Sequence, residues 1–376
     1  MAKILLIDDK VHIPENLRNA IIKKSPEFRS EIVIWNFETA EDMKNLYNEN
    51  IENELYNSNA DEDIWKRVLD KLGILMVVVD HDLSALNDVK ISESSITNAC
   101  KQLSIPVCTY HRKPPNTDSQ TLKDRVNQSR SFSIEINIDE DNDFQNAAQE
   151  IINVFYGFEE LKNKISHLEE ETLSGGPAKI LSSILEKPEL ESLFTRYTSS
   201  STLAADIIQY NNEEDEDELI SETIKSRLPF ILGCWLYNYI LPFPGIILNN
   251  IAAASYINID PEQLADKFFD EFKDAQYKGP FSNNDIYWWR YDLDQILFDA
   301  NSENAYEHLL QKNLLEVMPC KCSVSDTSPA GYYCIVRQAP ISFEESKGNL
   351  SWIPEGADLC RINKKIYRKL APIMGL

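Results

Sequence analysis

The sequence predicts an α/β protein with a five-stranded, parallel, doubly wound sheet, followed by a mostly α-helical second domain. Two observations lead to this fold class. In the first 141 residues, five short apolar segments alternate with segments of helical periodicity, and from residue 142 onward helical patterns dominate. Short strands that are apolar on both faces are typical of a parallel sheet covered by helices on both sides.

The expected strands are short runs rich in β-branched residues. They cover residues 3–7 (KILLI), 31–36 (EIVIWN), 73–80 (GILMVVVD), 104–110 (SIPVCTY) and 131–138 (SFSIEINI). Apolar residues at helical spacing predict helices at residues 14–24, 40–54, 61–72, 92–103 and 119–128. The acidic stretch near residues 50–65 is interpreted as an insert before the third strand.

A long helix is expected to connect the two domains, because apolar residues recur at helical spacing until the turn residues of LSGGPAK (173–179). The predicted parts are a first domain at 1–141, this connector at 142–172, and a second domain at 178–376. In the second domain we expect helices at residues 178–196, 202–210, 219–241, 245–257, 261–275, 285–299 and 303–315. A strand at 331–337 and a helix near 363–370 form a small mixed part at the end.

The composition excludes some classes of partner. The 376 residues contain 37 Lys and Arg against 61 Asp and Glu, a formal charge of −24, whereas binding to nucleic acid requires clustered cations. No apolar run is long enough to span a bilayer, and residues 1–9 lack the pattern of a secretory leader. Seven cysteines fit a reducing compartment. We therefore expect a cytoplasmic protein that binds neither nucleic acid nor membrane.

Carboxylates follow two of the predicted strands. Asp8 and Asp9 come directly after the first strand, and Asp80 ends the third. The carboxyl ends of parallel strands meet at one edge of a sheet, where ligands of open α/β folds bind. Three converging carboxylates repel one another, and Mg²⁺, which prefers oxygen ligands, relieves that repulsion. The sequence therefore predicts a magnesium site that also accepts an anionic group.

Residues 1 to about 158 resemble the receiver domains of two-component response regulators. KILLIDDK is similar to their first strand with its acidic pair, VVVDHDLS to the third strand with the phosphoacceptor aspartate, and SIPVCTY to the fourth strand. The resemblance implies that Asp80 accepts a phosphoryl group from a partner histidine kinase. It also implies that Asp8, Asp9, Asp80 and the backbone carbonyl of Asp82 hold Mg²⁺.

Two family features have no direct counterpart. The position of the hydroxyl residue that closes the fourth strand is occupied by His111, with Thr109 two residues earlier, and the fifth strand does not end in lysine. A cation from the run His111, Arg112, Lys113 could take the place of that lysine beside a phosphoryl group. We therefore name His111, Thr109 and Lys113 as further candidate site residues.

Two alternatives to phosphoacceptance stay open. A degenerate receiver could serve as a non-catalytic interaction module, including as a homodimer. The Asp-x-Asp pattern of Asp80 and Asp82 also resembles metal-dependent phosphatases of the haloacid-dehalogenase type, although there it follows the first strand. Metal dependence distinguishes a phosphoaccepting receiver from a non-catalytic module, and turnover of a phosphate ester distinguishes a phosphatase from both.

The second domain has no motif that assigns a function. The spacing of Cys320, Cys322, Cys334 and Cys360 matches no zinc template, so we expect core thiols rather than a zinc site. The aromatic run DIYWWRYDLDQIL (285–297) is expected to fill a core as a helix. A basic patch, which we expect to be a solvated helix face that could alternatively bind an acidic surface, comprises Arg361, Lys364, Lys365, Arg368 and Lys369.

Overall fold

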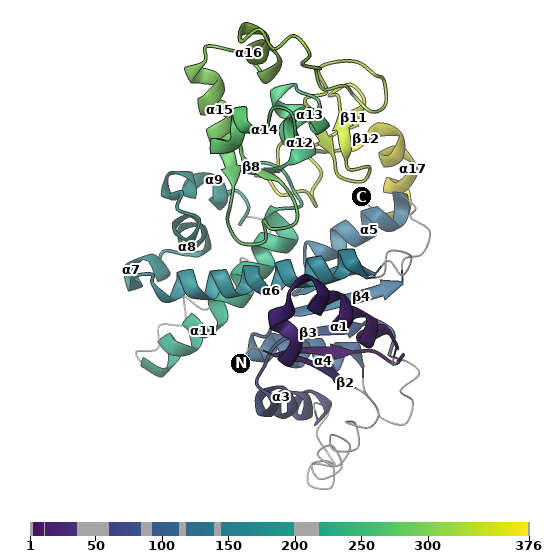
Figure 1. The fold of residues 1–376 in the computed structure, drawn as a ribbon, viewed down its shortest axis with the longest axis vertical. Helices are drawn as coiled ribbons and strands as arrows, with labels where there is room; N and C mark the ends of the chain where they lie inside the picture. The colour runs from purple at the N-terminus through teal and green to yellow at the C-terminus, as the bar shows by residue number, and fades with distance from the viewer. Residues whose placement is uncertain are drawn as a thin grey trace. The chain divides into compact units, whose positions relative to one another are not determined.

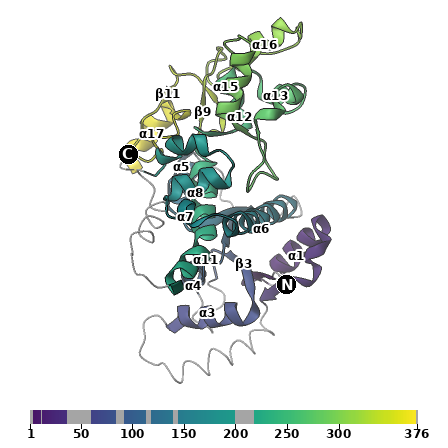
Figure 2. The ribbon, with the colours of Figure 1, turned by 90° about the vertical axis from the view of Figure 1, so that its left-hand side faces the viewer.

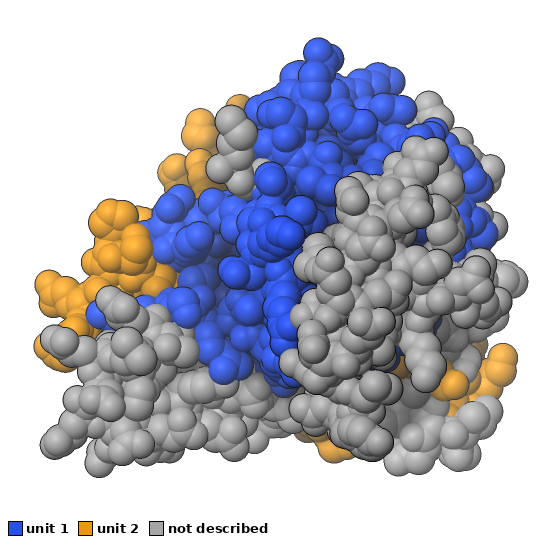
Figure 3. Space-filling model, turned by 90° about the horizontal axis from the view of Figure 1, so that it is seen from below, with its two compact units in different colours: residues 1–115, 131–163, 215–234 blue, residues 116–130, 164–214, 235–376 orange. Residues whose placement is uncertain are grey.

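The computed structural model describes residues 3–10, 12–35, 60–83, 92–112, 118–138, 144–198 and 218–374. The chain forms two compact units that interleave along the sequence (Figure 3). Unit 1 comprises residues 1–115, 131–163 and 215–234, and unit 2 comprises residues 116–130, 164–214 and 235–376. The sequence predicts consecutive domains, and the predicted domain boundaries stay a prediction.

Unit 1 contains the predicted five-stranded parallel sheet, which confirms the fold class (Figure 1). The strands lie in the order β2-β1-β3-β4-β5, and every neighbouring pair is parallel. Their bounds are β1 Lys3–Ile7, β2 Ile32–Trp35, β3 Ile74–Asp80, β4 Val107–Arg112 and β5 Ser133–Ile138. The order reverses direction between β1 and β3, which is the topological switch point of a doubly wound sheet.

One face of the sheet packs against helices α3 (Ala60–Leu72) and α4 (Glu93–Leu103). Alternation along the strands points Leu5, Ile7, Val77 and Val79 to this face, and all four side chains are buried. The indole rings of Trp35 on β2 and Trp65 on α3 extend the core, with centroids 4.9 Å apart. This packing explains why β1 and β3 carry apolar residues at these alternate positions.

The opposite face is covered as well, since Ile4, Leu6 and Val78 are at most 1% exposed. Figure 2 places β3 between α3 and α4 on one side and α1 (His12–Lys24) and α6 (Gln145–Ser166) on the other. Phe28, in the short 3₁₀ helix after α1, meets Phe155 of α6 edge to face at 5.2 Å. Burial on both faces accounts for the continuously apolar strands of the sequence.

Local residues fix the ends of the helices that lead into and out of β3. Gly73 has φ +64° and ends α3, and its N–H donates to the carbonyl of Asp70. Ser92 caps α4, because its hydroxyl accepts the N–H of Ser95 at 3.1 Å. The helix predicted at 40–54 lies outside the described residues, as does most of the predicted insert.

Unit 2 contains helices and two small sheets. The helices are α5 Asp118–Gln128, α7 Glu170–Leu173, α8 Pro177–Ile184, α9 Glu191–Thr195, α12 Asn250–Ile257, α13 Pro261–Ala265, α14 Phe269–Phe272, α15 Arg290–Asp299, α16 Ala305–Gln311 and α17 Lys364–Met374. One sheet has the order β6-β8-β7, from Ile247–Asn249, Tyr287–Trp289 and Gln276–Tyr277. The other has the order β10-β9-β12-β11, from Ala339–Ile341, Tyr332–Cys334, Cys360–Asn363 and Ser346–Lys347.

Two predicted helices begin with a strand instead. Residues 245–257 and 285–299 were expected to be helical throughout, but β6 and β8 occupy their first parts and pair antiparallel, with Leu248 opposite Trp288. Aromatic and β-branched residues fit a pleated surface, and the cross-strand pairing outweighs the helical periodicity. The expectation that these aromatic residues fill a core is met at Trp288 and Trp289, which are buried, but not at Tyr291, which is 49% exposed.

The long predicted helices are also interrupted. Residues 219–241 form α11 (Glu218–Trp235), followed by a π-helical turn at Leu236–Ile240, and the predicted connector forms α6 and the short α7. The predicted helix at 202–210 lies outside the described residues. In the part of the chain that is described, none of the helices has both the length and the apolar character needed to cross a bilayer.

Candidate functional site

The candidate site lies at the carboxyl edge of the unit 1 sheet. Ile7 of β1 pairs with Val79 of β3, and Asp80 of β3 pairs with Tyr110 of β4. Asp8 directly follows β1, so the register places it at the same level as Asp80 on β3 and Tyr110 on β4. This level coincides with the switch point between β1 and β3, where open α/β sheets bind their ligands.

The structure brings the three predicted carboxylates together. One ligand oxygen from each of Asp8, Asp9 and Asp80 lies within 4.8 Å of the other two. Among the described residues, this is the one group of His, Cys, Asp and Glu side chains close enough to hold a metal ion. We call these three residues the acidic trio.

Asp8 is the most enclosed carboxylate of the trio, with 5% of its surface exposed. Its Oδ1 accepts the N–H of Lys10 at 2.6 Å, and its Oδ2 accepts the hydroxyl of Tyr110 at 2.5 Å. Burial raises the pKa of Asp8 to about 6, and the charge of Asp80 adds to this rise, while both hydrogen bonds oppose it. Burial and the neighbouring carboxylates also raise the pKa of Tyr110, so its hydroxyl stays a donor.

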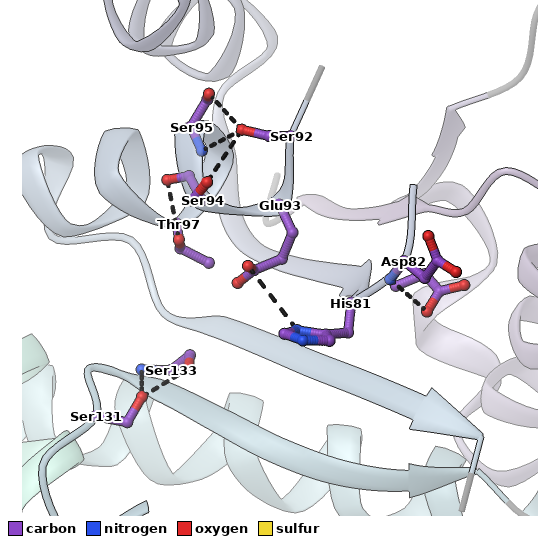
Figure 4. Close-up of polar contacts among 10 residues, drawn as sticks. His81, Asp82, Ser92, Glu93, Ser94, Ser95, Thr97, Ser131 and Ser133 are labelled. Carbon is purple, nitrogen blue, oxygen red and sulfur yellow. Dashed lines mark hydrogen bonds and ion pairs between the residues drawn. The ribbon is translucent and has the colours of Figure 1, made fainter. Parts of the chain in front are cut away.

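Asp80 ends β3 and is partly buried. Its Oδ1 accepts the N–H of Asp82 at 3.2 Å, a contact that fixes the turn after the strand (Figure 4). Burial raises the pKa of Asp80, and the charge of Asp9 acts in the same direction. A second carboxylate oxygen of Asp80 is thus available at the edge of the sheet for chemistry or for a cation.

Lys10 supplies a cation that the sequence analysis did not identify. Its Nζ lies 4.0 Å from Oδ1 of Asp9, and its positive charge lowers the pKa of Asp80. The residue directly follows the acidic pair in sequence, and that position is the signal that could have indicated it. With three carboxylates and one ammonium, the site has an excess of negative charge that favours a divalent cation.

The polar contacts beyond Asp80 connect the site with α4 (Figure 4). Nδ1 of His81 lies 3.9 Å from Oε2 of Glu93, the first residue of the helix. Burial raises the pKa of Glu93, and the charge of His81 opposes that rise. The first residue of α4 therefore lies beside the turn that follows β3.

The structure does not bring all predicted site residues to the acidic trio. Side chains alternate along β4, so Thr109 points to the face opposite Tyr110, and it is 8% exposed. The backbone of His111 pairs with Asn137 of β5, while its side chain and Lys113 lie outside the described residues. The roles of Thr109, His111 and Lys113, and of the backbone carbonyl of Asp82, stay predictions.

Tyr110 is the second residue that the sequence analysis missed. Its position next to His111 at the end of β4 could have suggested a place near the site. Its hydrogen bond to Asp8, however, depends on the strand order, which the sequence pattern alone does not determine.

The four cysteines singled out in the sequence lie in unit 2 and are buried. Cys334 is on β9 and Cys360 on β12, which pair in parallel, and burial raises the pKa of both thiols. Cys320 contacts the hydroxyl of Ser255, with 3.7 Å between Sγ and Oγ. Burial alone would raise the pKa of Cys322, but hydrogen bonds to its sulfur outweigh this effect and lower it. The expectation of core thiols rather than a zinc site stays a prediction.

Comparison with family models, with curated proteins and with solved structures gives no match to this chain. A parallel sheet of order β2-β1-β3-β4-β5 with an acidic cluster at its switch point is compatible with a receiver-like α/β fold.

Proposed function

We propose that unit 1 is a receiver-like signalling module in which Asp80 accepts a phosphoryl group from a partner histidine kinase. The observation that carries this proposal is the convergence of Asp8, Asp9 and Asp80 at the switch point of the sheet. The resemblance of KILLIDDK and VVVDHDLS to receiver strands supports the same assignment.

The residues of the acidic trio fit a hard divalent cation such as Mg²⁺. All the donors are carboxylate oxygens, the ligand type that this ion prefers, and they lie at an edge where waters and a phosphoryl group can complete the coordination. When bound, the ion would neutralise charge that develops on the phosphoryl oxygens. Asp8 and Asp9 would hold it together with Asp80.

In the proposed step, a carboxylate oxygen of Asp80 attacks the phosphorus of the donor. A bond from oxygen to phosphorus forms, the bond from phosphorus to the leaving group breaks, and the electron pair departs with that group. The hydrogen bond from the N–H of Asp82 orients one oxygen of Asp80. Lys10, whose Nζ lies 4.0 Å from Oδ1 of Asp9, would stabilise the negative charge of the acceptor and of the phosphoryl group, since strand β5 contains no lysine.

Incubation of the full chain with acetyl phosphate and Mg²⁺, followed by intact mass measurement, tests this proposal. We expect the wild-type chain to gain one phosphoryl group that hydroxylamine removes, because an acyl phosphate is cleaved by this nucleophile. Asp80→Asn is expected to gain none. Asp70→Asn, which changes an exposed aspartate of α3, is the matched control and should be labelled like wild type. Equal labelling of Asp80→Asn would exclude Asp80 as the acceptor.

One contact favours a second candidate function, a degenerate receiver that acts as a non-catalytic interaction module. The hydroxyl of Tyr110 engages Oδ2 of Asp8, so one oxygen of the trio already has a protein donor. In such a module the trio would be structural, and no phosphoryl group or analogue would bind. The absence of labelling in wild type would support this function.

A further inference from the structure

A separate pocket in unit 2 gathers positive charge in a strongly acidic chain. A cavity of about 310 Å³ lies where β11, β12 and the start of α17 meet. Its lining includes three cations, Lys347, Arg361 and Lys364, together with Phe343 and Ser346. We call it the cationic pocket.

Arg361 is held in a defined position within this pocket. Its Nε donates to the hydroxyl oxygen of Ser346 at 2.6 Å, and that hydroxyl, which is almost fully buried, donates to the carbonyl of Ser342. Its Cζ lies 4.7 Å from the ring centroid of Tyr332 and 4.6 Å from that of Phe343. The two aromatic rings and Ser346 hold the guanidinium, and its Nη groups are donors that can serve an anion.

The backbone beside Arg361 leaves room for this arrangement. A Cβ atom added to Gly348 would lie only 2.6 Å from Nη1 of Arg361. Any larger residue at position 348 would therefore push the guanidinium out of its place. Glycine at position 348 therefore leaves the space that the guanidinium of Arg361 occupies.

The three cations of the pocket form no ion pair with a described carboxylate. Among the described residues, no Asp or Glu oxygen lies within 4.0 Å of the charged nitrogens of Lys347, Arg361 or Lys364. The Nζ of Lys364 donates instead to the backbone carbonyl of Glu344. Burial lowers the pKa of the Arg361 guanidinium, as expected for a partly buried cation that lacks a counter-ion.

We propose that the cationic pocket binds the phosphate group of a small organic phosphate. Three cations around one cavity match a doubly charged oxyanion, and the guanidinium fork matches its oxygen geometry. The ring of Phe343 lines the same cavity and is 57% exposed, so it offers a surface for an apolar or aromatic part of the ligand. This site is independent of the role proposed for Asp80.

Calorimetric titration of the full chain at constant ionic strength tests the proposal. The probes are inorganic phosphate, phenyl phosphate and benzoate, which carries the same ring on a singly charged carboxylate. We expect phenyl phosphate to bind more tightly than inorganic phosphate, because its ring can pack on Phe343, and more tightly than benzoate.

Three variants test whether phenyl phosphate binds in the cationic pocket. Arg361→Gln is expected to weaken phenyl phosphate binding by about tenfold to a hundredfold, because it removes charge-assisted hydrogen bonds. Lys347→Gln, at an exposed position, is expected to weaken it to a lesser extent. Arg368→Gln makes the same charge change as Arg361→Gln on the exposed face of α17 outside the pocket, and it should bind like wild type.

The remaining outcomes would overturn the proposal. If none of the probes binds to wild type, the pocket is not an anion site. Equal weakening by Arg361→Gln and Arg368→Gln would indicate general charge attraction rather than a site. If benzoate binds as tightly as phenyl phosphate, the ligand chemistry is that of a carboxylate, and the assignment to phosphate is wrong.

Discussion

The hydroxyl of Tyr110 donates a hydrogen bond to Oδ2 of Asp8 at 2.5 Å. Tyr110 lies on β4 and Asp8 follows β1, so the contact passes over β3, the strand that ends in Asp80. Two steps across the sheet correspond to about 9–10 Å between the backbones, a distance that a tyrosine and an aspartate side chain can bridge together. This hydrogen bond joins three strands at the level of the proposed acceptor.

Removal of that hydroxyl should destabilise unit 1. In Tyr110→Phe the enclosed Asp8 carboxylate loses a donor, and we expect the free energy of unfolding at pH 7.5 to fall by about 1–3 kcal/mol. Urea unfolding measures this change. Tyr156→Phe is the matched control, since it deletes a hydroxyl that donates to Glu27 at an exposed position, and its effect should be clearly smaller. Equal losses in both variants would contradict the importance of the Tyr110 contact.

Lys10 should assist the acceptor chemistry. Its ammonium lies near the acidic trio and lowers the pKa of Asp80, so Lys10→Gln is expected to slow labelling by acetyl phosphate by roughly tenfold or more while preserving the fold. The initial rate of labelling measures this effect. Lys24→Gln, at the exposed end of α1, removes the same charge away from the site. A rate for Lys10→Gln equal to that of Lys24→Gln would show that Lys10 has no such role.

Substitution of Asp82 distinguishes a receiver that accepts one phosphoryl group from a phosphatase that turns over. A receiver uses the backbone carbonyl at this position, so Asp82→Ala should keep single-equivalent labelling. A phosphatase of the haloacid-dehalogenase type would need the second carboxylate as an acid and base. We therefore expect no sustained hydrolysis of a generic phosphate ester by wild type, measured as phosphate release. Sustained release that Asp82→Ala abolishes would favour the phosphatase.

Binding of Mg²⁺ should weaken as the pH falls. The pKa of Asp8 is about 6 in the metal-free protein, so below this pH a cation must displace a proton from the site. Coupling to one proton predicts a loss of up to about tenfold in affinity for each pH unit below 6. Titration calorimetry at pH 7.5, 6 and 5 measures this. An affinity that is constant over this range would contradict a role for Asp8 as a ligand.

The raised pKa of Asp8 has the opposite effect on the stability of the metal-free protein, which it increases at low pH. The pKa of Asp8 in the folded state exceeds its ordinary value of 3.8, so the folded protein binds the proton more tightly than the unfolded chain does. The contribution of Asp8 to stability therefore increases as the pH falls through 6 toward 4, and it is lost as the pH rises through 6.

The sequence located the sheet because each strand is buried on both faces. The apolar runs predicted both ends of β1 and the carboxyl end of β3 at Asp80, while β3 begins one residue later than predicted, at Ile74. The predicted fourth strand was placed too early, since Ile105 and Pro106 precede β4 and the strand continues to Arg112. Proline has no N–H to donate, which fits its place before the strand.

The sequence predicted the carboxylates of the candidate site but not their partners, because the partners depend on contacts between strands and around a turn. Carboxylates at strand ends can be found by position, and Asp8, Asp9 and Asp80 were found in this way. Tyr110 and Lys10 depend on contacts across the sheet and around a turn, which require the register of neighbouring strands. In unit 2, Tyr287 to Trp289 form β8 because of pairing with β6 and β7, and such long-range pairing leaves no periodic pattern in a three-residue segment.

Thermal unfolding with Mg²⁺ and beryllofluoride, which mimics an aspartyl phosphate, tests the role of Asp80 most directly. Wild type and Asp80→Asn are compared with and without the two additives. We expect wild type alone to be stabilised, by about 2.7 kcal/mol when the free ligand is about a hundred times its Kd. The same stabilisation in Asp80→Asn, or none in either protein, would contradict the account of Asp80 as a phosphoryl acceptor.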